Sequence, residues 1–304
     1  MNSPNIGGDA PNDHRLIPAF VNPTAGNAES ARGALAAVGG FDVREVPPQT
    51  LAGEVRKAIA DGATRILVAG GDGTIGSAAS ALSGTGVELA ILPCGTLNHL
   101  AKDLELPMAL EDAARAALNG SPVAVDAAVV NDRLFLNTSS VGAYVSFVRA
   151  RERLEKHLGY HIASLVAGIQ LLLHMPTFRI TLKTEGASRE YITPLVFIGV
   201  GERELQLPAL GARVKGGRTG LHVMVVRERS GGRAMALGLA AAARGTRAVA
   251  RTPAMDVFLV DECRIEARTH HAAVDGELVA LGRTLEYRHV PGQLRVIVAP
   301  NAAN

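Results

Sequence analysis

The stretch VAGGDGTIGSAAS, residues 68–80, turns an apolar strand into a helix through an unusually bare loop. The strand is RILVA (65–69), and three glycines follow it within four residues, around the carboxylate of Asp72 and before the hydroxyl of Thr74. Glycine permits backbone angles and a close ligand approach that side chains would prevent. A helix that begins after such a loop presents free amides and the positive end of its dipole. The stretch therefore predicts an anion site, most often for phosphate.

The same strand–loop–helix unit occurs twice more in the first 120 residues. LIPAFV (16–21) ends in NPTAG (22–26), and ELAILP (88–93) ends in CGTLN (94–98). DVREV (42–46) adds a further strand between the first two units. Strands that alternate with helices at this spacing predict a parallel sheet, so we expect a Rossmann-like α/β domain. Ligands of such sheets bind beyond the carboxyl ends of the strands, which is where all three loops lie.

Short β-rich segments separated by turn residues replace this pattern after about residue 122. They predict an antiparallel second domain with helices inserted at about 144–158, 161–175 and 233–249. The last strand, LRVIVAP (294–300), can belong to either domain. We expect a polar tail at 1–14, a nucleotide-binding α/β domain at 15–122 that 290–304 can complete, and a β-rich domain at 123–289.

The composition argues against several classes of protein. A net charge of only +2 does not indicate a nucleic-acid partner, because such proteins usually carry a strong basic patch. Cys94 and Cys263 belong to no CxxC pair, so they indicate reduced thiols in a cytoplasmic protein rather than a zinc site. The longest apolar stretch, 162–175, is shorter than the roughly 20 residues of a membrane-spanning helix, so no transmembrane span is predicted.

Four motifs together carry a family resemblance. They are NPTAG (22–26), GGDGT (70–74), LPCGTLNHLAKDL (92–104) and VDGE (274–277). No lysine follows the first glycine loop, so it is not a P-loop of the GxxxxGK[ST] type. The combination resembles the diacylglycerol kinase catalytic-domain family, which includes bacterial lipid kinases and the sphingosine kinases.

The resemblance implies an ATP-dependent kinase that phosphorylates a hydroxyl of a diacylglycerol-like or related lipid. It implies a β-sandwich as the second, lipid-substrate domain, with ATP and its companion Mg²⁺ in the cleft between the domains. The resemblance also implies a cytoplasmic protein that associates peripherally with a membrane surface. The nucleotide contacts that carry over are Asn22, Gly70, Gly71, Asp72, Gly73, Thr74, Gly95, Thr96 and Asn98. His99 stands where the family usually has Asp, and Lys102 where Arg is often found.

The catalytic acid has two candidates. From the residues alone, Asp275-Gly276 in VDGE predicts a hairpin turn. The resemblance to bacterial lipid kinases implies that Glu277 accepts the proton of the lipid hydroxyl. Asp72 is the rival, since the sphingosine kinase branch uses the equivalent residue to contact substrate. We favour Glu277 and keep both acids, with Asp275, as candidate catalytic residues.

The accessory metal site of the bacterial relatives is where this chain departs. Those relatives often have Asp-Gly-Leu where this chain has Thr219-Gly220-Leu221. Threonine lacks the charge that a hard divalent cation prefers, so the metal ligands stay unassigned.

Two other functions remain open. An NAD kinase-like enzyme would share GGDGT, although the Asn-Glu pair of that family is not evident. A non-catalytic, nucleotide-binding regulatory protein is the second alternative, and Thr219 favours it. The motifs do not specify the acceptor lipid or the oligomeric state.

Overall fold

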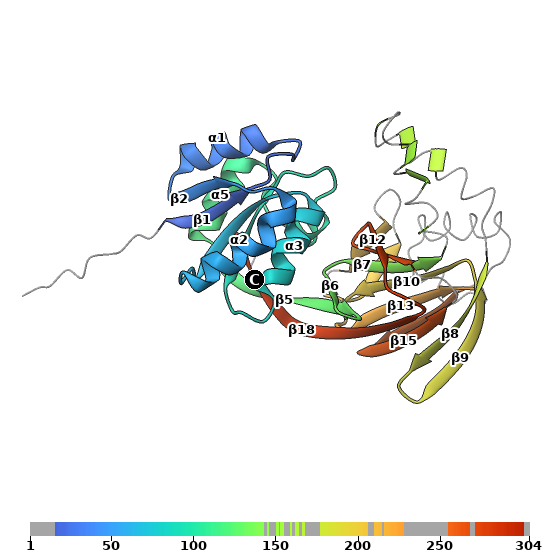
Figure 1. Cartoon of the computed structure of the whole chain (residues 1–304). Helices are drawn as coiled ribbons and strands as arrows, with labels where there is room; N and C mark the ends of the chain where they lie inside the picture. Colours follow the sequence, from blue (N-terminus) through green and yellow to red (C-terminus); the bar gives the residue numbers. More distant parts are fainter. Residues whose placement is uncertain are drawn as a thin grey trace, which may run out of the picture.

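The computed structural model describes residues 16–142, 177–205, 210–214, 216–227, 255–267 and 271–300, with short pieces between 145 and 167. The predicted tail at 1–14 and most of the three predicted inserted helices lie outside these residues. Two lobes are visible in Figure 1. We call the elements from β1 to α5 the first lobe and those from β5 to β17 the second lobe, while β18 belongs to both.

The first lobe alternates strands and helices as the sequence predicts. Its four strands are β1 (Ile17–Val21), β2 (Phe41–Glu45), β3 (Arg65–Gly70) and β4 (Glu88–Pro93). Its helices are α1 (Ala28–Val38), α2 (Pro48–Ala60), α3 (Asp72–Leu82), α4 (His99–Asp103) and α5 (Leu110–Asn119). The strands pair in parallel in the order β2-β1-β3-β4, which places the loops after β1, β3 and β4 at one edge of the sheet.

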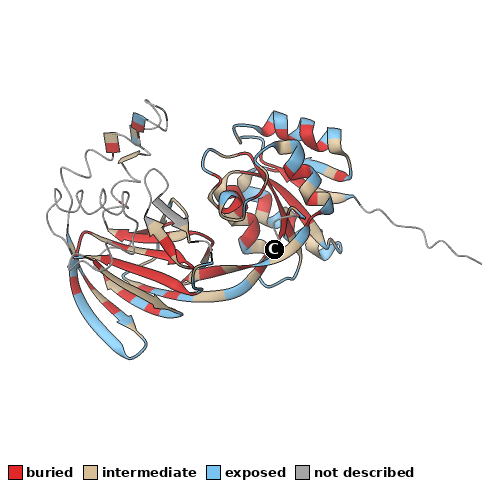
Figure 2. Cartoon of the chain, turned by 180° about the vertical axis from the view of Figure 1, so that it is seen from behind, coloured by how far each residue is buried: buried red, intermediate tan, exposed pale blue. Residues whose placement is uncertain are grey.

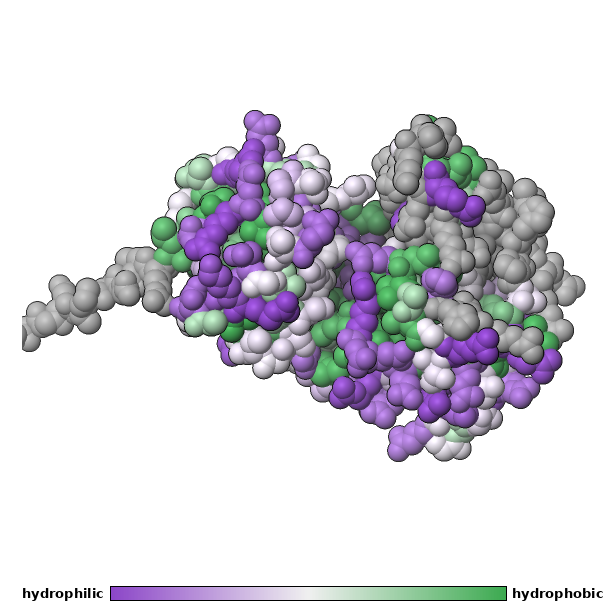
Figure 3. Space-filling model, viewed as in Figure 1, coloured by the Kyte–Doolittle hydropathy of each residue, from purple (hydrophilic) through white to green (hydrophobic). Residues whose placement is uncertain are grey.

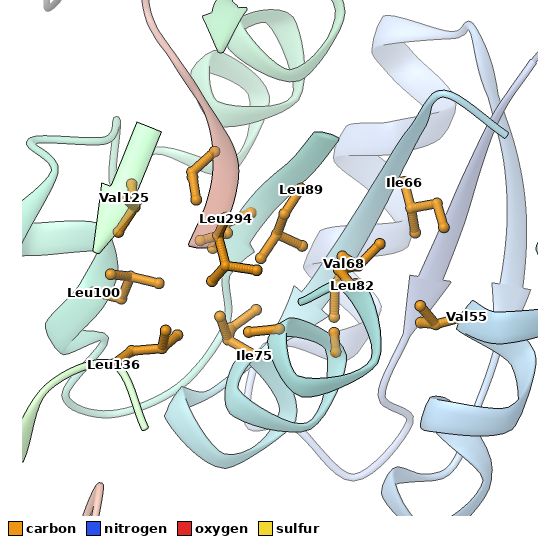
Figure 4. Close-up of a cluster of buried hydrophobic side chains, with 14 of the residues drawn as sticks. Val55, Ile66, Val68, Ile75, Leu82, Leu89, Leu100, Val125, Leu136 and Leu294 are labelled. Carbon is orange, nitrogen blue, oxygen red and sulfur yellow. The ribbon is translucent and has the colours of Figure 1, made fainter. Parts of the chain in front are cut away.

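Helices cover both faces of this sheet because side chains alternate along each strand. Ile66 and Val68 of β3 point into one core with α2, α3 and α4, whereas Leu67 and Ala69 point into the other with α1 and α5. Figure 4 shows the first of these cores, in which Ile75 and Leu82 of α3 pack beside Val68 and Leu89. The glycine loop is thus held between a fully buried strand and a firmly packed helix.

The second lobe is built from antiparallel strands in two large facing sheets and a separate two-stranded sheet, β11-β12. Its strands are β5 (Ser121–Val130), β6 (Arg133–Phe135), β7 (Thr138–Gly142), β8 (Phe178–Thr184), β9 (Ala187–Thr193), β10 (Leu195–Val200), β11 (Arg203–Leu205), β12 (Leu210–Arg213), β13 (Leu221–Val226), β14 (Met255–Val260), β15 (Glu262–Ala267), β16 (His271–Val274) and β17 (Glu277–Ala280). One six-stranded sheet runs β14-β13-β10-β7-β16-β17. Its inward side chains, such as Ile198 and Val223, pack against Ile180 and Ile265 of the other sheet.

Strand β18 (Thr284–Val298) joins the two lobes. Its first half pairs antiparallel with β15, and its end pairs parallel with β4, so the large sheet runs through both lobes. Its pairing with β5 shifts register between Val290 and Leu294, where the strand bends. The predicted last strand is therefore one end of β18, a single 15-residue strand that contributes to both lobes. Residues 288–293, where the strand passes between the lobes, are exposed or partly exposed, and its buried residues lie toward its two ends (Figure 2).

The structure confirms a mixed α/β chain with a parallel sheet and a second, antiparallel sheet. The strand order β2-β1-β3-β4 is that of flavodoxin-like sheets, so the finer Rossmann-like assignment is not confirmed. The domain boundaries stay predictions. No helix within the described residues is long and apolar enough to cross a membrane.

Candidate active site between the two lobes

The loops after β1 and β3 are joined by a buried hydrogen bond. Asn22 Nδ2 donates to Thr74 Oγ1 at 3.0 Å, and Asn22 is only 7% exposed. Asn22 Oδ1 accepts from the backbone amide and the hydroxyl of Thr24 at 3.0 and 2.8 Å. Asn22 therefore ties the two loops together. Because Thr74 Oγ1 accepts from Asn22, its own proton is left to donate.

The glycines of the opening stretch are required by contact between loops. A Cβ added to Gly95 would lie 2.5 Å from the Cα of Gly71, a backbone atom that cannot swing away. A Cβ on Gly70 would meet the Thr74 side chain at 2.5 Å. The loops after β3 and β4 thus pack backbone against backbone. These close contacts leave no room for a side chain at Gly70 or Gly95.

Asn98 shapes the loop after β4. Its backbone is left-handed, with a φ of 50°, and its Oδ1 accepts from the Gly95 amide at 2.9 Å. Its Nδ2 donates to the Gly95 carbonyl at 2.7 Å. Thr96, by contrast, is exposed and faces open space at the site.

Asp72 is paired with His99 at the start of α4. Oδ1 of Asp72 accepts from the His99 amide at 2.7 Å, and Oδ2 lies 3.3 Å from His99 Nδ1. Burial opposes ionisation of Asp72, but the hydrogen bonds and charge of His99 outweigh it and lower the Asp72 pKa. The hydrogen bond to Asp72 in turn raises the His99 pKa against the effect of burial. Both oxygens of this carboxylate are therefore occupied.

VDGE forms the predicted hairpin between β16 and β17. Asp275 and Gly276 both have positive φ, 47° and 84°, as a tight two-residue turn requires. The Asp275 carboxylate accepts from the amides of residues 136–138 at 2.8, 2.9 and 2.9 Å. Burial raises its pKa, and these amides oppose the rise. Asp275 thus pins the hairpin to the segment where β6 ends and β7 begins.

Glu277 brings the second lobe to the glycine loop. A Cβ added to Gly73 would lie 2.6 Å from Glu277 Oε1, so that oxygen rests against the Gly73 backbone. The other oxygen, Oε2, accepts from Nη2 of Arg133 at 2.6 Å. The Glu277 side chain is 55% exposed. The predicted acid and the predicted phosphate loop are thus in direct contact across the two lobes.

These groups line one open cleft of about 1380 Å³. Figure 3 shows the surface hollowed between the two lobes. The predicted site residues that line it are Asn22, Gly71, Asp72, Gly73, Thr74, Gly95, Thr96, Asp275 and Glu277. Gly70 and Asn98 lie behind the surface and support it. The basic residues that line the cleft, within the described part of the chain, are Arg56 and Arg133.

The residues around Thr219 do not fit a divalent metal ion. Thr219 is exposed, and the adjacent Arg218 pairs with Glu202, its backbone amide donating to Glu202 Oε2 at 3.1 Å. Across the described residues, no three His, Cys, Asp or Glu side chains come together as metal ligands could. We therefore assign no metal ligand there.

A buried ion pair joins α4 of the first lobe to β11 of the second lobe. Arg203 of β11 donates from Nη1 to Asp103 of α4 at 2.9 Å, and their side chains are 2% and 12% exposed. Arg203 Nε also donates to the Val200 carbonyl at 2.9 Å. Burial lowers the Arg203 pKa to about 10. Neither this pair nor the role of Arg133 can be predicted from the sequence, because partners 100 and 144 residues apart leave no local pattern.

A comparison with known protein families gives a match over the first lobe and strand β5. Residues 17–130 match the family model described as diacylglycerol kinase catalytic domain. The match covers 114 of the 304 residues of the chain. The predicted resemblance is confirmed for the three motifs that lie inside this segment, while VDGE (274–277) lies outside it.

Curated relatives match about half of this chain. "Probable lipid kinase YegS-like" of Pseudomonas putida is 36% identical over 152 residues, which cover 48% of this chain and 50% of that protein. The protein of the same name from Cronobacter sakazakii is 30% identical, over 49% of this chain and 52% of its own. The chain thus spans about half the length of the curated relatives it matches.

The fold extends further than the sequence match. A crystal structure of a diacylglycerol kinase from Bacillus anthracis str. Sterne matches 94% of this chain and 98% of its own, with a TM-score of 0.66 and 18% identity. A second crystal structure from the same organism has a TM-score of 0.73 at 20% identity, with the same coverage. At these identities the comparison shows a shared fold for both lobes.

Proposed function

We propose that this protein is an ATP-dependent lipid kinase, which transfers the γ-phosphate to a hydroxyl of a diacylglycerol-like or related lipid. The observation that carries the proposal is the contact between Glu277 Oε1 and Gly73, which sets a carboxylate beside a phosphate-type loop. The family of residues 17–130 supports the kinase class. The names of the curated relatives support a lipid as the acceptor.

The first lobe offers donors for a triphosphate. Helix α3 has no side-chain cap at its first turn, so the amides after Gly71 are not satisfied by a capping side chain. Such amides, with the helix dipole, bind phosphate well. The Thr74 hydroxyl can donate to the same anion, and Thr96 faces it from the loop after β4. ATP bound here would supply the phosphoryl group that is transferred.

Glu277 is the proposed proton acceptor. It would orient the lipid hydroxyl and take its proton as the hydroxyl oxygen attacks the γ-phosphorus, with ADP as the leaving group. Asp72 is less available for that step, because His99 occupies both of its oxygens. Asp275 would act by holding the hairpin that carries Glu277. Phosphoryl transfer depends mainly on such positioning and on neutralising charge.

Several finer assignments belong to the same proposal. Mg²⁺ would enter with ATP, and no protein ligand is assigned to it. The nucleotide domain would be 15–122, completed by the end of β18, and the lipid-substrate domain 123–289. The protein would act in the cytoplasm at a membrane surface, where its substrate is found.

A transfer assay tests this function. Purified protein is incubated with Mg²⁺, γ-labelled ATP and mixed micelles of neutral lipids or long-chain bases, and NAD is offered in a separate reaction. We expect label in a lipid, and we expect Glu277→Gln to lower the rate by about 10²–10⁴-fold, as for loss of a general base. Label in NAD alone would favour an NAD kinase-like enzyme. ATP binding by calorimetry without transfer to any acceptor would favour a regulatory nucleotide-binding protein.

A further inference from the structure

We propose that Arg133 is a positioning residue for the phosphoryl transfer, because it holds the Glu277 carboxylate against Gly73. This inference rests on the proposed function of the cleft. It assigns a role to a residue that lies outside the four motifs, on a short strand of the second lobe.

Arg133 and Glu277 both stand on firmly held backbone. Each is the first residue of a strand, β6 and β17 respectively, and each follows a turn with a left-handed residue. The turn before Arg133 is held by Asn131, whose Nδ2 donates to the Leu281 carbonyl at 3.0 Å and whose Oδ1 accepts from the Glu286 amide at 2.9 Å. The turn before Glu277 is held by the three amides that bind Asp275. The two side chains therefore meet from rigid supports.

The pair divides the two oxygens of Glu277 between two tasks. Oε2 accepts from Nη2 of Arg133 at 2.6 Å, and Oε1 faces Gly73. A charge-assisted hydrogen bond of this length is strong and directional. Because the bond from Arg133 fixes Oε2, rotation of the carboxylate is restricted, and Oε1 remains directed at the Gly73 loop. Arg133 thus sets which oxygen is presented to the incoming hydroxyl.

Stability does not explain this contact. The Arg133 and Glu277 side chains are 42% and 55% exposed, and exposed ion pairs contribute little to the free energy of folding. Within the described residues, the bond from Arg133 is the hydrogen bond that holds the Glu277 carboxylate. A half-exposed glutamate then samples several rotamers. A misplacement of roughly 1 Å can slow a reaction by about 10²-fold.

The test compares four variants with the wild type in the lipid-transfer assay. They are Arg133→Met, Arg133→Lys, Glu277→Gln and the double variant Arg133→Met/Glu277→Gln. Arg115→Met is the control, because Arg115 forms exposed ion pairs on α5 and does not line the cleft. We measure kcat, KM for ATP, the calorimetric Kd for ATP and the unfolding temperature.

We expect Arg133→Met to lower kcat by about 10²-fold, with the Kd for ATP and the unfolding temperature unchanged. Lysine at 133 should restore about a tenth or more of the rate, since it keeps the charge but not the planar fork. The double variant should be no slower than Glu277→Gln alone, because both changes remove the same positioned group. Arg115→Met should behave as wild type.

Three results would overturn the role. They are a kcat for Arg133→Met equal to that of Arg115→Met, a large rise in its Kd for ATP, and full additivity with Glu277→Gln. A crystal structure of Arg133→Met decides the point without an activity assay. We expect the Glu277 side chain to leave Gly73 while the 274–277 backbone stays in place, and an unmoved Glu277 would refute the inference. A wild type that labels no lipid would refute only the proposed function.

Discussion

Replacing Gly73 by alanine should make the protein more stable and less active at the same time. Gly73 is the second residue of α3, and its φ lies outside the left-handed region, so alanine can adopt its conformation. Alanine in a helix is favoured over glycine by about 0.5–1 kcal/mol. We therefore expect a gain of roughly that size in the free energy of unfolding.

The loss of activity follows from the contact with the second lobe. The new Cβ would lie 2.6 Å from Glu277 Oε1. An ordinary contact is at about 3.5 Å, so the carboxylate must move by roughly 1 Å. Glu277 can do so cheaply, because the contact is with the far end of a flexible side chain. We expect the move to lower kcat for lipid phosphorylation by about 10²-fold.

Two assays and one control decide the matter. Urea unfolding gives the change in free energy, and the labelled-ATP assay gives kcat, with calorimetry to show that ATP still binds. Gly53→Ala in α2 is the matched control, since Gly53 is exposed and no atom lies within 4 Å of an added Cβ there. It should gain stability and keep full activity. If Gly73→Ala kept the wild-type kcat, our account of Glu277 against this loop would be refuted.

Three further changes test the rest of the site. Gly95→Ala should destabilise the chain by about 1–3 kcal/mol and abolish calorimetric ATP binding, because its Cβ meets backbone rather than a side chain; a variant that binds ATP normally would contradict this. Asp103→Asn should lower the free energy of unfolding in urea by about 3–5 kcal/mol, because it leaves the buried Arg203 charge without its partner. Adding Arg203→Met should recover part of that loss. If the single and the double variant lost the same free energy, the pair would not be the cause. The His99–Asp72 pair should contribute stability while His99 is charged and Asp72 ionised. Because the His99 pKa is raised in the folded state, this contribution is present below its ordinary pKa of 6.5 and fades as the pH rises through the raised value. Because the Asp72 pKa is lowered, the contribution is also lost on strong acidification, below its ordinary value of 3.8. The difference in unfolding free energy between wild type and His99→Asn should follow that window, and a pH-independent difference would count against the pairing.

The local sequence was sufficient for the alternating lobe and for the loops that face the cleft. Apolar runs such as RILVA ended in Gly or Asn where a strand had to stop, and the structure has strands within a residue or so of the predicted ones. The hairpin at Asp275-Gly276 was equally readable, since only a few residue types accept two positive φ angles in succession. These features depend on neighbours along the chain, so a window of a few residues contains their cause.

The arrangement of functional groups depended on contacts that no such window contains. Asn98 and Asp275 are predicted site residues, and the sequence does not show that their side chains bind backbone amides and hold loops. Arg133 has no distinguishing feature in the sequence, yet it donates a hydrogen bond to Glu277, the acid beside the glycine loop. Composition and spacing cannot report which of a side chain's possible partners it finds, because that choice is made when strands distant in sequence pack into one sheet.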